Sequence, residues 1–145
     1  MRLSNIAYLK WILPFFNKRL ANGYYRAQGR VDDTMNLSGI KVSAAEIEQV
    51  LQPLPEVQEV AAIAVSSNGP SQLVVCVVLT LVAKAEALMP EDLRTRFQQV
   101  IRHTLNPLFH LQEVVILDAL PRTASNKVMR RQLRNLKKEG HKSLP

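Results

Sequence analysis

The stretch GRVDDTMNLSGIKVSAAEIE, residues 29–48, decides the fold of this chain. It begins with Gly29, which is followed by a mixed-charge cluster of Arg30, Asp32 and Asp33. Gly39 has no Cβ, so the backbone there is free to turn or to approach a ligand closely. Ser43 and Glu46 stand three residues apart before an apolar periodic run, which is the spacing of a capping box at the start of an amphipathic helix. The stretch therefore predicts a polar hairpin followed by a helix.

A second polar motif, LPRTASNKVMRR, occupies residues 120–131. Lys127 follows a Thr-Ala-Ser-Asn loop and stands near the start of a helix that the sequence predicts from about Asn126. An ammonium group in this setting is well placed to present a point charge to a phosphate or a carboxylate. The alternative interpretation is a solvated lysine on a basic helix.

The composition indicates one globular domain. The chain has 145 residues, of which 47% are hydrophobic and 21% are charged. Its single cysteine, Cys76, lies in an apolar run and fits a reducing compartment, so we expect a cytoplasmic location. The net charge of +7 is compatible with nucleic acid, a membrane surface or a phosphate-rich ligand.

The periodicity predicts a small compact α+β domain with an N-terminal hairpin, a short, mainly three-stranded sheet and about three helices. The paired strands of the expected hairpin are residues 24–26 and 40–42. The strands of the expected sheet are residues 57–65, 73–82 and 114–117. The expected helices begin near Ser43, Pro90 and Asn126. The domain is expected to span residues 23–140, with an N-terminal extension at 1–22 and a tail at 141–145.

Residues 1–22 are apolar and basic, and their role is unclear from the sequence. Lys10 and Pro14 interrupt the apolar run, which therefore fits a signal peptide poorly and is too short to span a membrane. Trp11 and two phenylalanines alternate with basic residues, which leaves an interfacial membrane anchor open. The alternative is a packed or poorly ordered extension.

The two motifs resemble, in the right order, two motifs of the small C-terminal domain of the AMP-forming acyl-CoA synthetases. These enzymes belong to the adenylate-forming superfamily, together with luciferases and peptide-synthetase adenylation domains. In this chain the first motif reads Gly-Arg-Val-Asp-Asp…Ser-Gly…Glu-Ile-Glu. The second, Pro-Arg-Thr-Ala-Ser-Asn-Lys followed by Arg-Arg, resembles the family's Pro-Arg-Thr-x-Ser-Gly-Lys followed by Arg-Arg. The resemblance covers roughly residues 23–138. Asn126 stands where the family usually has glycine, and the Thr-Gly-Asp motif that the family places before Gly23 is absent.

The resemblance implies roles for six residues. Lys127 would bridge the substrate carboxylate and the α-phosphate, and would stabilise the charge that develops as pyrophosphate leaves. Asp32 would be the hinge about which the domain swings between an adenylation pose and a thioester-forming pose, and Arg30 would approach the nucleotide ribose. The residues that would face coenzyme A are Ser38, Gly39 and Lys41. A turn-capping role for Asp32 and a surface ion pair for Arg30 remain open as alternatives.

The resemblance also implies partners. ATP/AMP and coenzyme A would be substrates shared with a large N-terminal adenylating domain, with Mg²⁺ accompanying ATP and a small-molecule carboxylate as the acyl donor. The sequence has no phosphate-binding glycine loop and no ribose-binding aspartate motif, so the chain is not expected to act as an acid–thiol ligase alone. We expect a free-standing or truncated C-terminal domain of such a ligase.

The competing hypothesis is a regulatory or binding module for an anionic ligand or nucleic acid, without a ligase role. The basic segment 122–142 would carry that binding, but it has no Phe, Trp or Tyr on which bases could stack, so nucleic acid is not favoured. His103, His110 and His141 lack the spacing of metal ligands, so no metal site is expected.

Overall fold

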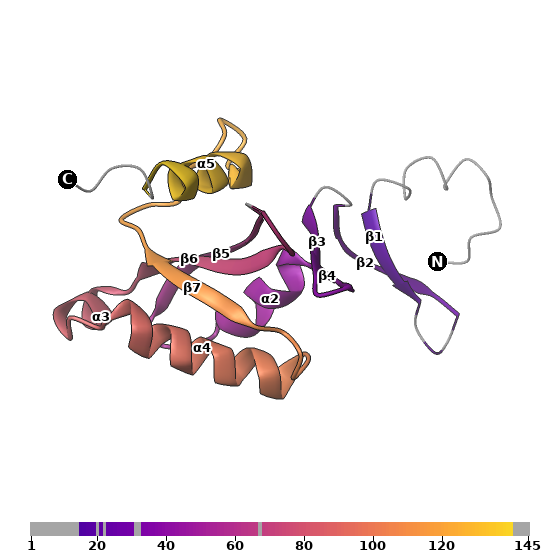
Figure 1. The fold of residues 1–145 in the computed structure, drawn as a ribbon, viewed down its shortest axis with the longest axis horizontal. Helices are drawn as coiled ribbons and strands as arrows, with labels where there is room; N and C mark the ends of the chain where they lie inside the picture. Colours follow the sequence, from indigo (N-terminus) through magenta and orange to yellow (C-terminus); the bar gives the residue numbers. More distant parts are fainter. Residues whose placement is uncertain (1–14, 20, 22, 31–32, 67, 141–145) are drawn as a thin grey trace.

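The computed structural model describes residues 15–19, 21, 23–30, 33–66 and 68–140. The strands within these residues are β1 (Phe15–Arg19), β2 (Tyr25–Arg30), β3 (Thr34–Leu37), β4 (Ile40–Ser43), β5 (Val57–Val65), β6 (Gln72–Leu79) and β7 (Leu111–Ile116). The helices are α2 (Ala44–Leu51), α3 (Leu81–Ala85), α4 (Pro90–Thr104) and α5 (Arg130–Gly140) (Figure 1). The α+β class is confirmed.

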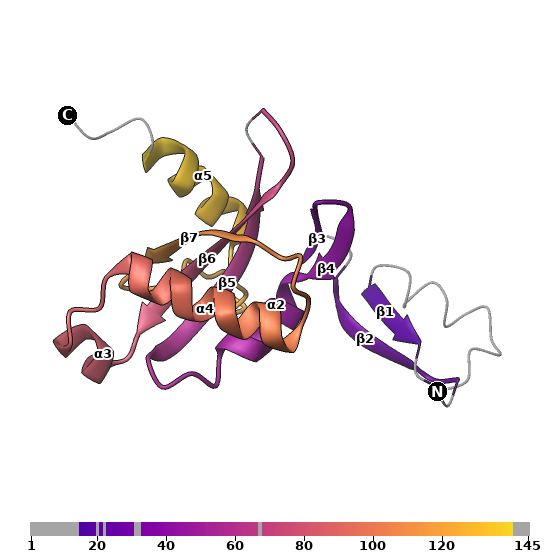
Figure 2. The ribbon, with the colours of Figure 1, turned by 60° about the horizontal axis from the view of Figure 1, so that its bottom comes forward.

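A three-stranded sheet in the order β5-β6-β7 forms the centre of the fold. The middle strand β6 pairs antiparallel with β5 and parallel with β7. Helices α2 and α4 cover one face of this sheet and α5 lies over the other, which gives three layers (Figures 1 and 2). The turn that joins β5 to β6 is the one expected at Asn68-Gly69-Pro70.

Because both faces of the sheet are covered, alternate residues of a strand enter two separate cores. Val75 and Val77 of β6 pack with Ile47 of α2 and Phe97 of α4. The residues between them face α5, where the second core consists of Ala61, Ile63, Val74, Cys76, Val78, Leu120 and Leu133. The last seven residues of β6 are therefore all buried, because the sheet is the middle one of the three layers.

Helix α2 begins as the sequence predicts. The Ser43 hydroxyl accepts a hydrogen bond from the Glu46 N–H at 3.2 Å, and the Glu46 carboxylate accepts one from the Ser43 N–H at 3.1 Å. This reciprocal pair is a capping box, and it satisfies two donors that would otherwise lack partners at the helix start. Ile47 and Leu51 then face the core.

The expected pairing of residues 24–26 with 40–42 is wrong. Strand β4 pairs instead with β3, in a register that sets Leu37 opposite Ile40, while β2 pairs with β1. The two residues of the β3–β4 turn, Ser38 and Gly39, have φ of 53° and 85°. Positive φ at both central residues is the geometry of a two-residue type I′ hairpin turn, which matches the twist of the flanking strands and favours this local pairing.

Two further boundaries differ from the expectation. The strand expected at residues 73–82 ends at Leu79, because the Thr80 hydroxyl caps a short helix, α3, by accepting from the Ala83 N–H at 3.4 Å. The helix expected from about Asn126 begins at Arg130, since the preceding residues form a turn of their own. Helix α3 also makes the described helices four rather than three.

The expected boundary between residues 22 and 23 is spanned by the β1–β2 pair, in which Lys18 lies opposite Arg26. The domain limits therefore stay a prediction. Residues 1–14, on which the anchor hypothesis mainly rests, lie outside the described part of the chain. No helix in the described part is long and apolar enough to cross a membrane.

Candidate functional site

Residues 121–129 form a compact turn, called here the lysine turn, between the sheet and α5. Arg122 and Val128 make an antiparallel bridge across it. The Thr123 N–H donates to the Lys127 carbonyl oxygen at 2.8 Å, and the Met129 N–H donates to the Pro121 carbonyl oxygen at 2.8 Å. Backbone hydrogen bonds near the tip of the turn, and at the point where the chain enters and leaves it, fix the path of the chain.

The tip of the lysine turn explains the Thr-Ala-Ser-Asn sequence. The Thr123 hydroxyl accepts a hydrogen bond from the Lys127 N–H at 3.1 Å and lies 3.0 Å from the Ser125 hydroxyl. Asn126 has φ of 63°, the left-handed region that asparagine adopts more readily than most residues. Asparagine thus supports at this position a backbone conformation that glycine would also adopt.

Lys127 itself is exposed. Its backbone is held at both N–H and C=O, whereas its side-chain amine has no hydrogen bond or ion pair with any residue the structure describes. The turn therefore presents a cation on a fixed backbone to whatever approaches this surface. A lysine ammonium with three free donors suits a phosphate or a carboxylate.

Arg122 joins the lysine turn to the sheet, a role that sequence reasoning missed. One guanidinium nitrogen donates to the Asn126 carbonyl oxygen at 3.0 Å, and the other donates to Glu59 Oε2 on β5 at 2.7 Å. The planar fork of arginine serves both partners at once, which a lysine would not do in the same geometry. The only signal in the sequence was an arginine five residues before Lys127.

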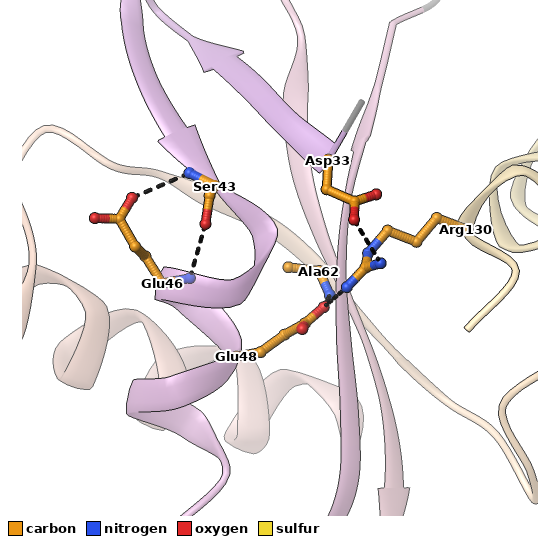
Figure 3. Close-up of polar contacts among 6 residues, drawn as sticks. All are labelled: Asp33, Ser43, Glu46, Glu48, Ala62 and Arg130. Atoms are coloured by element: carbon orange, nitrogen blue, oxygen red, sulfur yellow. Dashed lines mark hydrogen bonds and ion pairs between the residues drawn. The ribbon is translucent and has the colours of Figure 1, made fainter. Parts of the chain in front are cut away.

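Arg130, the first residue of α5, directly follows the lysine turn and pairs with two carboxylates (Figure 3). Its Nη2 lies 2.7 Å from Glu48 Oε1 on α2, and its Nη1 lies 3.3 Å from Asp33 Oδ2. The same Glu48 oxygen accepts a hydrogen bond from the Ala62 N–H of β5 at 2.9 Å. We call Arg130, Glu48 and Asp33 the arginine cluster. Sequence reasoning missed this cluster as well.

The expected coenzyme A residues lie on the β3–β4 hairpin. Ser38 and Gly39 form its exposed tip, and Lys41 is exposed on β4 opposite Asn36. No atom lies within 4 Å of a Cβ placed on Gly39, so the glycine is required by its φ of 85° rather than by crowding within the chain. Asp33 lies at the opposite end of the hairpin, about 13 Å away for four residues of strand. The structure therefore does not bring the hairpin tip and the arginine cluster together.

The remaining two predicted site residues are Arg30 and Asp32. The backbone of Arg30 ends β2, but its side chain is not among those the structure describes. Asp32 lies outside the described residues, and its neighbour Asp33 belongs to the arginine cluster.

A pocket of about 390 Å³ lies between α5 and the sheet, away from the lysine turn, and Cys76 and Glu113 line it. Burial raises the pKa of the Cys76 thiol to about 11, and the Glu113 carboxylate adds to the rise. The thiol is therefore protonated at neutral pH and unsuited to nucleophilic chemistry. Nowhere in the described part of the chain do three His, Cys, Asp or Glu side chains gather as metal ligands would.

Comparison with known proteins gives a consistent result. The sequence profile of the AMP-binding enzyme C-terminal domain matches residues 46–127. The chain is 50% identical over 123 residues to the probable acyl-activating enzyme 17, peroxisomal, of Arabidopsis thaliana, a match that covers 81% of this chain and 16% of the relative. It is 47% identical over 117 residues to the hexanoyl-CoA synthase of Cannabis sativa, covering 79% and 16%. It thus spans about one-sixth of the length of these curated relatives.

Solved structures show the same fold. A crystal structure of the anthranilate CoA ligase AuaEII in complex with anthranoyl-AMP superposes with a TM-score of 0.72 at 27% identity, covering 90% of this chain and 25% of the ligase. A benzoate CoA ligase from Burkholderia xenovorans LB400 superposes with a TM-score of 0.69 at 28% identity, covering 92% and 27%. Both similarities extend over nine-tenths of this chain or more.

Proposed function

Since this chain belongs to the family of AMP-binding enzyme C-terminal domains, we propose that it serves as the mobile, lysine-bearing domain of an AMP-forming acyl-CoA ligase. The observation that carries the proposal is the exposed Lys127 ammonium, which stands on a turn fixed by hydrogen bonds on both sides and has no partner among the described residues. Such an ammonium group is free to bind an anionic group that lies outside this domain.

In the first half-reaction, a carboxylate oxygen attacks the α-phosphorus of ATP, the bond to the β-phosphate oxygen breaks, and an acyl-adenylate and pyrophosphate result. Negative charge builds up on the phosphate oxygens as the bond breaks. We assign Lys127 to stabilising that charge by bridging the carboxylate and the α-phosphate. How much this interaction stabilises the transition state depends on preorganisation. A donor that is already in place does not have to reorganise as the charge develops, so little free energy is spent on moving it.

The contacts of the lysine turn supply this preorganisation. Arg122 holds the carbonyl oxygen of Asn126, and the Thr123 hydroxyl holds the Lys127 N–H. Only the flexible lysine side chain then remains to be ordered when substrate binds, which limits the entropy lost.

In the second half-reaction, the coenzyme A thiol attacks the acyl carbonyl, a thioester forms and AMP leaves. We assign the hairpin tip to the pantetheine arm, with Ser38 and Gly39 beside it and Lys41 near the coenzyme A phosphates. The separation of about 13 Å between the tip and Asp33 along the hairpin supports separate roles for the two ends of the hairpin. Arg30 would contact the ribose, and Asp32 would be the hinge between the two poses.

The proposal requires a partner and substrates. A large N-terminal adenylating domain would supply the nucleotide and acyl pockets, and ATP/AMP, coenzyme A and a small carboxylic acid would be the substrates. Mg²⁺ would arrive with ATP. A cytoplasmic location is part of the same proposal, since Cys76 is a free, buried thiol.

Domain replacement tests the proposal. Residues 23–140 of this chain would replace the matching segment of the Arabidopsis relative, with which the chain shares 50% identity. We expect the hybrid to catalyse carboxylate-dependent ATP–pyrophosphate exchange with an acid that the parent enzyme activates, and the 145-residue chain alone to catalyse none. A folded hybrid without exchange, beside an active parent, would contradict the proposed function.

A further inference from the structure

We propose that Arg130 is a positioning residue that locks the lysine turn to Asp33, so that Lys127 and the segment just after the expected hinge move as one rigid unit. This inference rests on the proposed function, and it adds two residues, Arg130 and Asp33, to those on which adenylation would depend. Three features support it: the geometry of the cluster, its burial and its position in the chain.

The geometry of the arginine cluster joins three separate elements. Arg130 donates from Nη2 to Glu48 Oε1 at 2.7 Å and lies within 3.3 Å of Asp33 Oδ2 through Nη1. Glu48 is fixed in turn, because the same oxygen accepts the Ala62 N–H at 2.9 Å (Figure 3). Arg130 thereby connects the start of α5 to α2, to β5 and to the residue that precedes β3.

The side chains of the cluster are largely removed from water, as is that of Lys137 farther along α5, which is 19% exposed and pairs with Glu113. The side chain of Arg130 is 17% exposed, that of Glu48 is 20% exposed, and that of Asp33 is 30% exposed. The Nε of Arg130 is buried without a hydrogen-bond partner, which is unfavourable by itself. The neighbouring Arg131 is exposed and forms no ion pair with the described residues. Partial removal of a cation from water strengthens its attraction to the two carboxylates and gives the cluster a defined geometry.

The position of the cluster in the chain connects it to the chemistry. Lys127 precedes Arg130 by three residues, so their Cα atoms are at most about 11 Å apart. Asp33 directly follows Asp32, the residue assigned to the hinge. A rotation about residue 32 would therefore turn Asp33, Arg130 and the lysine turn together. Without the Asp33–Arg130 pair, the orientation of the lysine turn relative to the hinge would be less well defined.

The adenylation pose is the one that needs this orientation, because Lys127 has to reach the carboxylate and the α-phosphate together. Thioester formation would use the other end of the hairpin and would depend on the pair less. The predicted signature is thus selective damage to one half-reaction. A merely structural role would instead damage both half-reactions in proportion to the fraction of protein unfolded.

The test is a double-mutant cycle in the hybrid enzyme described above. We expect Asp33→Asn and Arg130→Gln each to lower the adenylation rate on the order of tenfold, and the double variant to be no slower than Arg130→Gln alone, because both changes break one interaction. Transfer from a pre-made acyl-adenylate to coenzyme A should change less than about twofold. Arg130→Lys should recover part of the rate, since it keeps the charge but not the fork. Arg131→Gln removes the same charge from the next residue and should leave both rates unchanged.

Additive losses, equal losses in both half-reactions, or unchanged adenylation in the single variants would each overturn the inference while leaving the proposed function intact. A second measurement, on the 145-residue chain itself, does not depend on ligase activity. Hydrogen exchange at the Lys127 and Met129 amides should speed up in Asp33→Asn and in Arg130→Gln, without a further increase in the double variant. If the hybrid shows no adenylation, this exchange result decides: coupled changes support the link, and unchanged exchange overturns it.

Discussion

Arg122 donates a hydrogen bond to the carbonyl oxygen of Asn126 at 3.0 Å, across the tip of the turn that presents Lys127. The φ of Asn126, 63°, is unusual for a residue other than glycine. Arg122 binds the peptide group between Asn126 and Lys127, directly after this residue. A side chain thus stabilises the one strained position of the lysine turn. Glu59 on β5 holds the arginine in place from the other side at 2.7 Å.

Replacement of Lys127 by alanine should separate the two half-reactions in the hybrid enzyme. By analogy with the loss of one preorganised donor, adenylation should fall by about 10²–10³-fold. Transfer from a pre-made acyl-adenylate to coenzyme A should be largely intact, because the lysine would be withdrawn in that pose. Rates of pyrophosphate exchange and of thioester formation measure the two steps. Lys138→Ala removes an exposed lysine from α5 and should leave both unchanged. Equal damage to both steps by Lys127→Ala would mean that the lysine is structural.

Substitution of Gly39 should affect both stability and thioester formation. Gly39→Ala places a Cβ on a residue with φ of 85°, and we expect the chain to lose about 1 kcal/mol of unfolding free energy. Gly39→Asn should lose less, since asparagine tolerates left-handed angles. Gly69→Ala is the matched control, because that glycine also has open space around it but no positive φ. Denaturant unfolding measures these changes, and equal losses for Gly39→Ala and Gly69→Ala would contradict the turn geometry.

Gly39→Leu tests the assignment of the hairpin tip to coenzyme A. In the hybrid enzyme, the larger side chain should crowd the pantetheine arm and slow thioester formation, while adenylation proceeds. The KM for coenzyme A in the transfer half-reaction is the direct measurement. An unchanged KM together with an unchanged transfer rate would remove the hairpin tip from the coenzyme A site.

Glu48→Ala should destabilise the chain more than a typical surface substitution. The change leaves the Ala62 N–H without its acceptor and removes the closer of the two carboxylates from Arg130. Loss of an acceptor from partly buried donors costs about 2 kcal/mol. Gln49→Ala alters the next, exposed residue of α2 and should change the unfolding free energy by less than about 0.5 kcal/mol. A small effect of Glu48→Ala would show that water replaces the carboxylate in the cluster.

Cys76 makes stability depend on pH in the alkaline range. The folded chain holds the thiol pKa at about 11, above the ordinary value of 9.0 that the thiol has in an unfolded chain. Between these two values the folded state binds more protons, so stability is fully present below pH 9 and is lost as the pH rises through 11. The loss amounts to about 3 kcal/mol at most. Cys76→Val removes the titrating group, so the unfolding free energy of the parent should fall relative to that of the variant as the pH rises from 9 to 11. Parallel curves for both would contradict the shift.

The features that local sequence determines were predictable. The capping box needs only Ser43 and Glu46, three residues apart, and α4 begins at Pro90 as its sequence indicates. The β3–β4 pairing was missed because the turn uses Ser38 in a left-handed conformation, for which serine gives little signal. The contacts that hold the lysine turn were also missed. Arg122 and Glu59 are 63 residues apart, and Arg130 and Glu48 are 82 apart, so only the folded chain identifies these partners.

Strand β6 has a consequence for the synthesis of this domain. Its sequence, QLVVCVVL, contains neither a charge nor a proline, which is the composition of an aggregation-prone segment. Strand β5 covers one edge as soon as the hairpin forms, but the other edge waits for β7, which the ribosome makes only after α3 and α4. Until Leu111–Ile116 has emerged, the nascent chain exposes an apolar strand with an open row of backbone donors and acceptors. Chaperone demand during translation should therefore be greatest for chains halted between β6 and β7.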